Sequence, residues 1–145
     1  YLFTDTLQLG DGFWFHAPEA AANASITVAG QVNEATTLSV DVPGNKQFKI
    51  CANPFPAAVN LKNVATTGIS DVGFEEMDEN AARIDVRVGN IYLSYYYISD
   101  AEDASGEYVT GWADGDGYLV DSNVIEAGSS FWINSPNAGS LIFSL

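Results

Sequence analysis

Short segments in which apolar and polar residues alternate dominate this chain. A period of two puts one set of side chains in a core and the other in solvent, which is typical of half-buried β-strands. The pattern predicts strands at 25–28, 37–42, 47–50, 83–88 and 140–143, separated by turns rich in Gly, Pro, Asn and Asp. At 19–24 and 75–82 we expect at most one helical turn. We therefore predict an all-β fold, an antiparallel β-sandwich or barrel-like domain.

The end of the chain repeats its beginning, so that residues 1–29 resemble residues 118–145. With one gap, the matches are Tyr1 with Tyr118, Leu7 with Ile125, Gly10 with Gly128, Phe13-Trp14 with Phe131-Trp132, and Pro18 with Pro136. A repeated unit usually buries its apolar face against another unit. We treat 1–29 as an orphan half-module and assembly segment, and 30–145 as the sandwich module, together one domain. The half-module either packs in cis beside 118–145 or completes a neighbouring subunit.

Length and composition indicate one folded domain. The chain has 145 residues, of which 47% are apolar and 17% charged, and its net charge is −14. The last basic residue is Arg87. This charge argues against nucleic acid and anionic membrane surfaces as partners, and no apolar run is long enough for membrane insertion. The chain begins at Tyr1 without Met, so we expect a mature product after removal of a leader, with a fragment as the alternative.

Few residues could support catalysis. The only histidine, His16, corresponds to Asn134 in the second copy, so we interpret it as a polar residue at a strand end. The only cysteine, Cys51, excludes an intramolecular disulfide and is predicted to be a small core residue. A carboxylate pair for glycoside hydrolysis stays open because acids are plentiful. We predict that the protein is not an enzyme and needs no cofactor, although calcium is a possible ligand and glycans are possible partners.

The calcium candidates are Asp114 and Asp116, in an acidic stretch that follows Trp112. Hard oxygen ligands at alternate positions suit Ca²⁺. The EF-hand pattern fails, because aligning Gly117 with the turn glycine puts Trp112 at the first ligand position. Solvated acidic loops with Asp-Gly turns explain the same residues.

A tyrosine-rich segment at 91–98 predicts a strand covered on both faces. Alternation puts Leu93, Tyr95 and Tyr97 on one face and Tyr92, Tyr96 and Ile98 on the other. We expect subunit contact through Tyr92 and Tyr96, and the alternative is a sugar ring stacked on tyrosine. Trp14 and Trp132 are interpreted as core anchors of the repeated motif. Asn23 begins the one N-glycosylation sequon, in a loop that would accommodate a glycan.

Several segments resemble secreted bacterial surface β-modules. They are the run 48–56 with its Asn-Pro-Phe-Pro element, the tyrosine strand, Trp112-Ala113-Asp114-Gly115, and 127–132 with its Ala-Gly-x-x-Phe-Trp sequence. The match covers 47–145, and the whole is similar to subunits of helical extracellular fibrils, some glycan-coated, of environmental bacteria. The resemblance implies an extracellular or cell-surface β protein without catalytic residues.

From these observations we predict a structural subunit of an extracellular bacterial filament, a helical homopolymer. Tyr1, Phe3, Leu7 and Leu9 lie at even spacing, interrupted by Asp5, and could anchor a donated strand. Head-to-tail contacts that do not close a ring produce such filaments. The alternative is a monomeric carbohydrate-binding or adhesion module.

Overall fold

The computed structural model describes residues 8–13, 36–53 and 55–144. In chain order its elements are β1 (Thr37–Val42), β2 (Gln47–Ala52), β3 (Val59–Asn60), η1 (Leu61–Asn63), β4 (Val64–Thr67), η2 (Phe74–Glu76), α1 (Met77–Asn80), β5 (Arg83–Val88), β6 (Ile91–Glu102), β7 (Tyr108–Ala113), β8 (Asn123–Ile125), β9 (Ser130–Ser135) and β10 (Gly139–Ser144). The strands expected at 37–42, 47–50, 83–88 and 140–143 are confirmed, as is the helical turn within 75–82. The segments at 19–24 and 25–28 lie outside the described residues.

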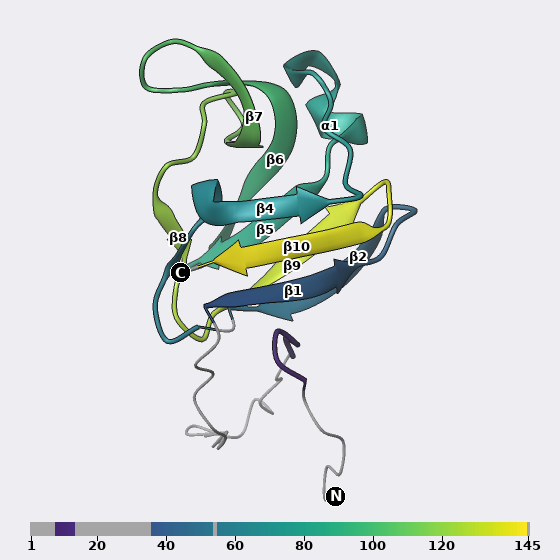
Figure 1. Cartoon of the computed structure of the whole chain (residues 1–145), viewed down its shortest axis with the longest axis vertical. Coiled ribbons are helices and arrows are strands. Elements are labelled where there is room, and N and C mark those ends of the chain that lie inside the picture. The colour runs from purple at the N-terminus through teal and green to yellow at the C-terminus, as the bar shows by residue number, and fades with distance from the viewer. Residues whose placement is uncertain (1–7, 14–35, 54, 145) are drawn as a thin grey trace, which may run out of the picture.

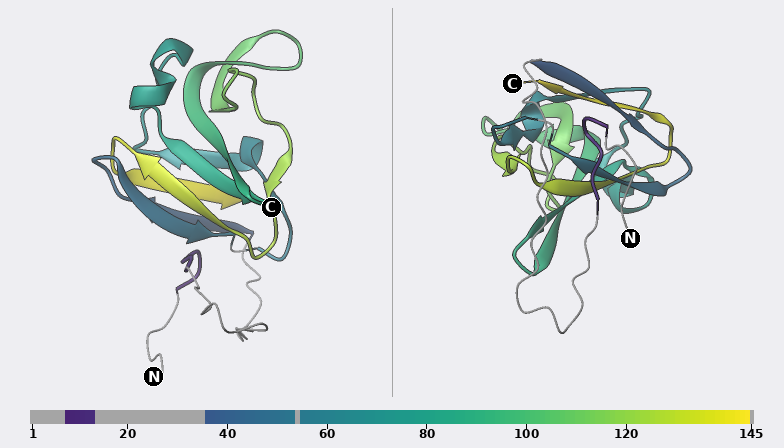
Figure 2. Two further views of the ribbon diagram at one scale, coloured as in Figure 1. Left: turned by 180° about the vertical axis from the view of Figure 1, so that it is seen from behind. Right: turned by 90° about the horizontal axis from the view of Figure 1, so that it is seen from below.

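The fold is a sandwich of two antiparallel sheets (Figures 1 and 2). One sheet has three strands in the order β1-β10-β4, and the other has five in the order β2-β9-β5-β6-β7. A small third sheet pairs β3 with β8. β1 and β2 follow each other in sequence but belong to different sheets, because the turn between them carries the chain from one layer to the other. The all-β sandwich prediction is therefore confirmed.

The core lies between the two sheets and contains one side of each strand. β9 contributes Phe131 and Ile133, which are at most 1% exposed, and β10 contributes Leu141 and Phe143, which are fully buried. The rings of Phe131 and Phe143 meet across the layers, with their centroids 5.8 Å apart. Cys51 is also fully buried there, as the sequence predicted. Burying each large side chain of this kind contributes about 1.5–3 kcal/mol, so the alternating pattern is what holds the sandwich together.

Trp112 on β7 closes one end of the core. It is 1% exposed, its Nε1 donates a hydrogen bond of 3.2 Å to the carbonyl oxygen of Val64, and its ring lies 5.3 Å from that of Tyr97. A buried indole needs such a partner for its N–H. Trp112 is therefore a structural residue, and no ligand can stack on it without opening the core.

A second apolar cluster lies where β6 continues past the sandwich. Met77 and Ala81 pack there against Ile98, Ala101 and Ala113. Figure 1 shows α1 beside the upper parts of β6 and β7, away from β1. Because β6 runs to Glu102, beyond the tyrosine segment, this end of the molecule projects from the sandwich.

Candidate interaction surface

The side of the five-stranded sheet that faces away from the three-stranded sheet is not covered by any other described sheet, and we call it the outer face. Register determines its residues, because residues directly opposite each other in neighbouring strands lie on the same side. Arg83 pairs with Tyr96, Asp85 with Ser94, and Arg87 with Tyr92. Asp85 also pairs with Trp132, and Asn134 with Phe48. Four strands therefore present aromatic and polar side chains together on this face.

At the centre of the outer face, Asp85 is held by two partners. It is 9% exposed, its Oδ1 accepts a 2.6 Å hydrogen bond from the Ser94 hydroxyl, and its Oδ2 accepts one of 3.2 Å from Nε of Arg83. A buried carboxylate is tolerated only when it is paired and hydrogen-bonded in this way. The three side chains form a fixed polar group on a sheet face that is otherwise rich in aromatic residues.

Aromatic rings surround this polar group. Phe48 and Trp132 make an edge-to-face contact with centroids 6.4 Å apart, and the Arg83 guanidinium lies 5.7 Å from the centroid of Phe48. Phe48 and Tyr92 are 55% and 46% exposed. A shallow hollow of about 620 Å³ has as its lining Phe48, Arg83, Asp85, Tyr92, Ser94 and Trp132. Aromatic and Arg side chains are the residue types that protein interfaces prefer.

The outer face ends at β2, which is an edge strand of the five-stranded sheet. Its inner side pairs with β9 along its whole length, from Gln47 opposite Ser135 to Ala52 opposite Ser130. On the edge of β2 that points away from β9, the described residues pair with the strand at a single bridge, between Asp11 and Cys51. Alternate residues of an antiparallel strand direct their backbone groups to opposite sides. Since the Ala52 N–H points away from β9, the N–H groups of Ile50 and Phe48 do so too. The described residues make no other pairing with β2 on that edge, which we call its open side.

The two copies of the repeat form the same turn at either side of β2. Asp11 N–H bonds to Gln8 O, and Ser129 N–H bonds to Glu126 O, each at 3.0 Å. The matched glycines both have positive φ, 88° at Gly10 and 70° at Gly128, which favours glycine. The two turns then accept from the last residue of β2 and the residue after it, because Ala52 N–H bonds to Gly10 O and Asn53 N–H to Ser129 O, both at 2.9 Å.

The end of the molecule at α1 and the β6–β7 hairpin is acidic. Glu75, Asp100, Glu102 and Asp116 line a hollow there, next to the ring of Tyr108, which is 70% exposed. Residues 63–82 and 88–145 contain no Lys or Arg. This end therefore differs in charge from the outer face.

The proposed calcium ligands lie in a tight turn at this end. One oxygen of Asp114, Oδ1, accepts hydrogen bonds of 3.0 Å from the backbone N–H groups of Asp116 and Tyr118. Such an Asx turn is the alternative that the sequence left open. Among the described residues, no three His, Cys, Asp or Glu side chains converge on a point where a metal ion could sit. Calcium at Asp114 and Asp116 stays a prediction.

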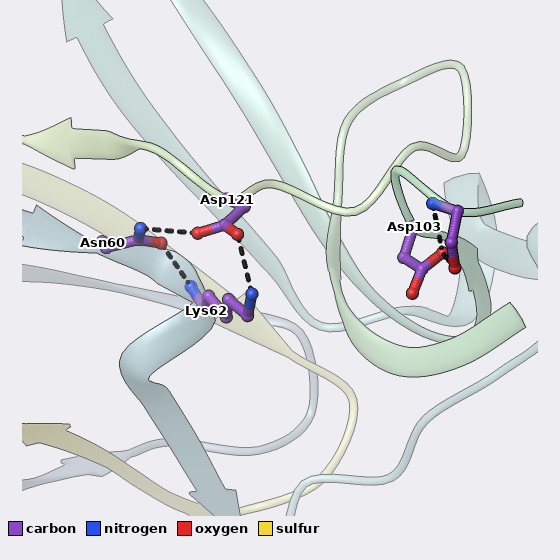
Figure 3. Close-up of polar contacts among 5 residues, drawn as sticks. Asn60, Lys62, Asp103 and Asp121 are labelled. Atoms are coloured by element: carbon purple, nitrogen blue, oxygen red, sulfur yellow. Dashed lines mark hydrogen bonds and ion pairs between the residues drawn. The ribbon is translucent and has the colours of Figure 1, made fainter. Parts of the chain in front are cut away.

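Two other polar groups have structural roles (Figure 3). Asp103 Oδ1 accepts from the hydroxyl and N–H of Ser105 and from the N–H of Glu107, and these bonds, the Ser105 hydroxyl first, lower the pKa of its carboxyl. Lys62 Nζ donates a 2.7 Å hydrogen bond to Asp121, whose other oxygen accepts from Asn60. The hydrogen bond between Lys62 and Asp121 raises the pKa of Lys62 and lowers the pKa of Asp121.

Of the other predicted site residues, Tyr92, Tyr96 and Leu9 are among those that the structure describes. Tyr92 and Tyr96 both lie on the outer face, opposite Arg87 and Arg83, so the predicted division of the tyrosine strand is confirmed. Leu9 lies in the turn before Gly10 and is 50% exposed. Tyr1, Phe3, Leu7, Trp14, His16 and Asn23 lie outside the described residues.

The prediction that Trp132 is a core anchor is wrong. Its neighbour Phe131 fills the core, and Trp132 points to the outer face, where it contacts Phe48. Adjacent residues of a strand point to opposite sides, so only one of the pair could be buried in the sandwich. Sequence reasoning also missed the polar group of Arg83, Asp85 and Ser94. The signal was present, because the charged residues of 83–87 alternate in step with the tyrosines of the following strand.

A comparison of the chain with protein-family models, with curated proteins and with solved structures found no match. Among the helices of the described residues, none has the length and apolar character needed to cross a membrane.

Proposed function

We propose that this chain is a structural subunit of an extracellular bacterial filament, which polymerises through β-strand addition and aromatic contacts. The observation that carries the proposal is that the open side of β2 lies next to the aromatic outer face of the five-stranded sheet. On the open side of β2, the described residues form one bridge, between Asp11 and Cys51. The outer face begins directly beside this edge, at the exposed ring of Phe48.

The open edge supports strand addition. An unpaired strand edge is a template for another chain, and its main-chain hydrogen bonds provide affinity while side-chain pockets fix the register. The bridge at Cys51 is built by the turn that copies 126–129, so an incoming segment has a reference point for its register. The repeat of β9 by the beginning of the chain supplies a sequence suited to this role.

The aromatic face supports the second kind of contact. Monomeric proteins seldom expose contiguous apolar patches of this sort without a partner. Tyr92 and Trp132 are of the residue types that dominate binding energy at interfaces. The Asp85 carboxylate on the same face already accepts hydrogen bonds from Arg83 and Ser94.

The test of strand addition is a proline that blocks the edge without touching the β2–β9 ladder. Phe48→Pro removes a backbone N–H directed to the open side, whereas Phe48→Ala removes the same side chain and keeps that N–H. We expect the wild-type chain to grow in size with concentration, and the Pro variant to assemble at least tenfold more weakly than the Ala variant. Light scattering and negative-stain electron microscopy measure both. Equal assembly by the two variants would rule out strand addition at β2.

A second candidate function is a monomeric carbohydrate-binding or adhesion module. The hollow on the outer face favours it, because aromatic rings flank hydrogen-bonding groups of Arg83, Asp85 and Ser94. Stacking on a ring with polar groups at its edge suits a sugar. Calorimetric titration with neutral oligosaccharides would then show saturable binding that Tyr92→Ala abolishes and that Tyr108→Ala, at the acidic end, leaves intact. A chain that assembles and binds no sugar excludes this candidate.

A further inference from the structure

We propose that two copies of this chain pair through β6, with residues 91–95 of one copy adding antiparallel to residues 91–95 of the other about a two-fold axis at Leu93. The contact goes beyond strand addition at β2 and does not depend on it. A two-fold contact closes after two copies. It therefore pairs copies, and growth of a filament still depends on β2.

β6 extends past the strand beside it. β7 ends at Ala113, opposite Tyr96, and the chain then turns away at Asp114. Residues 91–95 pair with β5 on one side. On their other side, no strand of the described residues pairs with them. We call this side of 91–95 the open edge of β6.

The backbone of the open edge has hydrogen-bonding groups directed toward a partner. Tyr97 N–H bonds to the carbonyl oxygen of Ala82 at 2.9 Å, on the β5 side of the strand. Alternate residues of an antiparallel strand direct their N–H and C=O groups to opposite sides, so Tyr92 and Ser94 direct theirs away from β5. Each of these two residues can therefore exchange hydrogen bonds with a residue opposite it on an added strand.

The open edge lacks the features by which soluble proteins protect a strand edge. Such edges usually carry a charged side chain, a proline or a bulge. The sequence from 88 to 99 contains no charged residue and no proline, and the register shift of β6 begins only at Ile98. Instead, Ile91, Tyr92 and Leu93 are 60%, 46% and 39% exposed. An unprotected edge with exposed apolar side chains marks a site of contact.

A groove of about 720 Å³ lies along this edge. One of its walls is β6 from residue 92 to 96, and the other is the chain after β7, at 114–115 and 119–122. The groove therefore lies where β7 would continue if the chain did not turn away. The room for an added strand extends from residue 91 to 95, because Tyr96 is already paired and residues 89–90 form the turn before β6.

The segment that fits this room is the same segment of a second copy. When two open edges pair antiparallel about an axis at Leu93, Tyr92 of each copy lies opposite Ser94 of the other. These are the residues whose backbone groups point outward, so the pairing satisfies them. On the side of the strand that faces the core, Leu93 meets Leu93, and Ile91 of each copy meets Tyr95 of the other. Each copy thus covers apolar residues that the other exposes.

The end of β7 fixes this register. A shift of two residues in one direction would place the second copy against Tyr96, which is already paired with Ala113, and a shift in the other direction would pair the turn at 89–90. A shift of one residue would exchange the two faces of the added strand. The arrangement about Leu93 is therefore the register that uses the whole open edge.

Charge favours a second copy at this place. With a net charge of −14, most surfaces of two copies repel each other, but this segment is uncharged. Two acids line the groove, and one of them, Asp121, is paired with Lys62 at 2.7 Å. The other, Asp114, lies at one end of the open edge, so antiparallel pairing separates the two copies of it by about 14 Å along the strands. This exceeds the Debye length of about 8 Å at physiological salt.

Disulfide cross-linking tests the pairing and its register. Leu93→Cys places two thiols in a pair of residues that are not hydrogen-bonded to each other, where the Cα atoms are about 4.5 Å apart and a disulfide can form. Ile91→Cys is the matched control, because it lies on the same face and is more exposed, but its counterpart is about 14 Å away along the strand. Cys51 is fully buried and should not interfere. Under mild oxidation we expect Leu93→Cys to form covalent dimers at least tenfold faster than Ile91→Cys, as measured by non-reducing electrophoresis.

A second test removes a backbone donor of the open edge. Tyr92→Pro removes an outward N–H, whereas Tyr92→Ala removes the same side chain and keeps that N–H. Both are made in the Phe48→Pro chain, in which addition at β2 is blocked, so that longer assemblies do not hide the dimer. Analytical ultracentrifugation should show that Phe48→Pro is dimeric, and that Tyr92→Pro weakens the dimer at least tenfold more than Tyr92→Ala. Circular dichroism checks folding, and if Tyr92→Pro fails to fold, the cross-linking rates decide.

Other outcomes overturn the inference in distinguishable ways. Cross-links that form equally fast at residues 91 and 93 would show that the copies do not pair in this register. Equal dimerisation of the two Tyr92 variants would show that the backbone of the open edge is not used. If the wild type forms filaments while Phe48→Pro is monomeric, the filament function stands and this contact is wrong. If both stop at dimers with the expected cross-link, this contact stands and the filament function fails.

Discussion

Asn53 lies at the junction between β2 and the Asn-Pro-Phe-Pro element, and its replacement should be among the most destabilising polar changes in the chain. Its side chain is 5% exposed. Nδ2 donates to the carbonyl oxygen of Ala57 at 2.7 Å and to those of Ile125 and Glu126, both at 3.1 Å, while Oδ1 accepts from the N–H of Phe55 at 2.9 Å. One amide therefore connects the end of β2 to the turn before β9.

The magnitude follows from these bonds. The amide has two N–H groups, which donate to three carbonyl oxygens, and its Oδ1 accepts from one N–H. Truncation to Ala therefore removes the equivalent of about three hydrogen bonds. Each contributes about 1 kcal/mol net, and a buried group left without a partner costs about 1–3 kcal/mol more. Asn53→Ala should therefore lower the free energy of unfolding by about 3–5 kcal/mol, a large part of the roughly 5–15 kcal/mol that is typical of a domain.

Urea denaturation followed by tryptophan fluorescence measures this loss, since Trp112 is buried in the core and reports its opening. At a slope of about 2 kcal/mol per molar urea, the midpoint should fall by about 2 M. Asn60→Ala is the control, because that side chain bonds to exposed partners, Asp121 and the N–H of Lys62 at the start of η1, and its loss should cost about 1 kcal/mol. A loss below about 1 kcal/mol at Asn53 would refute the account of the junction.

Three further outcomes are expected. Burial raises the pKa of Cys51 to about 11, so the thiol should resist alkylation at pH 8 in the folded chain. Because the thiol of the unfolded chain ionises at lower pH, the free energy of unfolding should fall between pH 9 and 11, by up to about 3 kcal/mol. Urea titrations at alkaline pH measure this fall. The pKa of Asp103 is lowered, so its ionised carboxyl stabilises the β6–β7 hairpin above the ordinary pKa of 3.8, and this stabilisation is lost as the pH falls through the lowered pKa. Amide exchange at Glu107 should become faster at that low pH, and in Ser105→Ala the faster exchange should begin at a higher pH. Gly117→Ala should cost about 1–2 kcal/mol in thermal unfolding, because φ is +87° and the added Cβ would lie 2.8 Å from the Phe74 ring, whereas Gly115→Ala meets nothing within 4 Å and should be nearly neutral.

The long strands could be predicted from sequence because each presents one side to a core. β1 and β5 have the predicted limits, since their apolar residues alternate without interruption. The short strands β3, β4 and β8 have two to four residues and too few alternations to be detected. They are fixed by pairing with other strands, which a local pattern does not contain.

The outer face was only half predictable. The tyrosines were found because they are concentrated in one segment, whereas Phe48 and Trp132 join them only through the register of β2 and β9. The repeat drew attention to Phe131-Trp132 as a unit and so led to the wrong assignment of Trp132. Alternation within that pair was the stronger constraint, because it depends on strand geometry rather than on the reason why the motif is repeated.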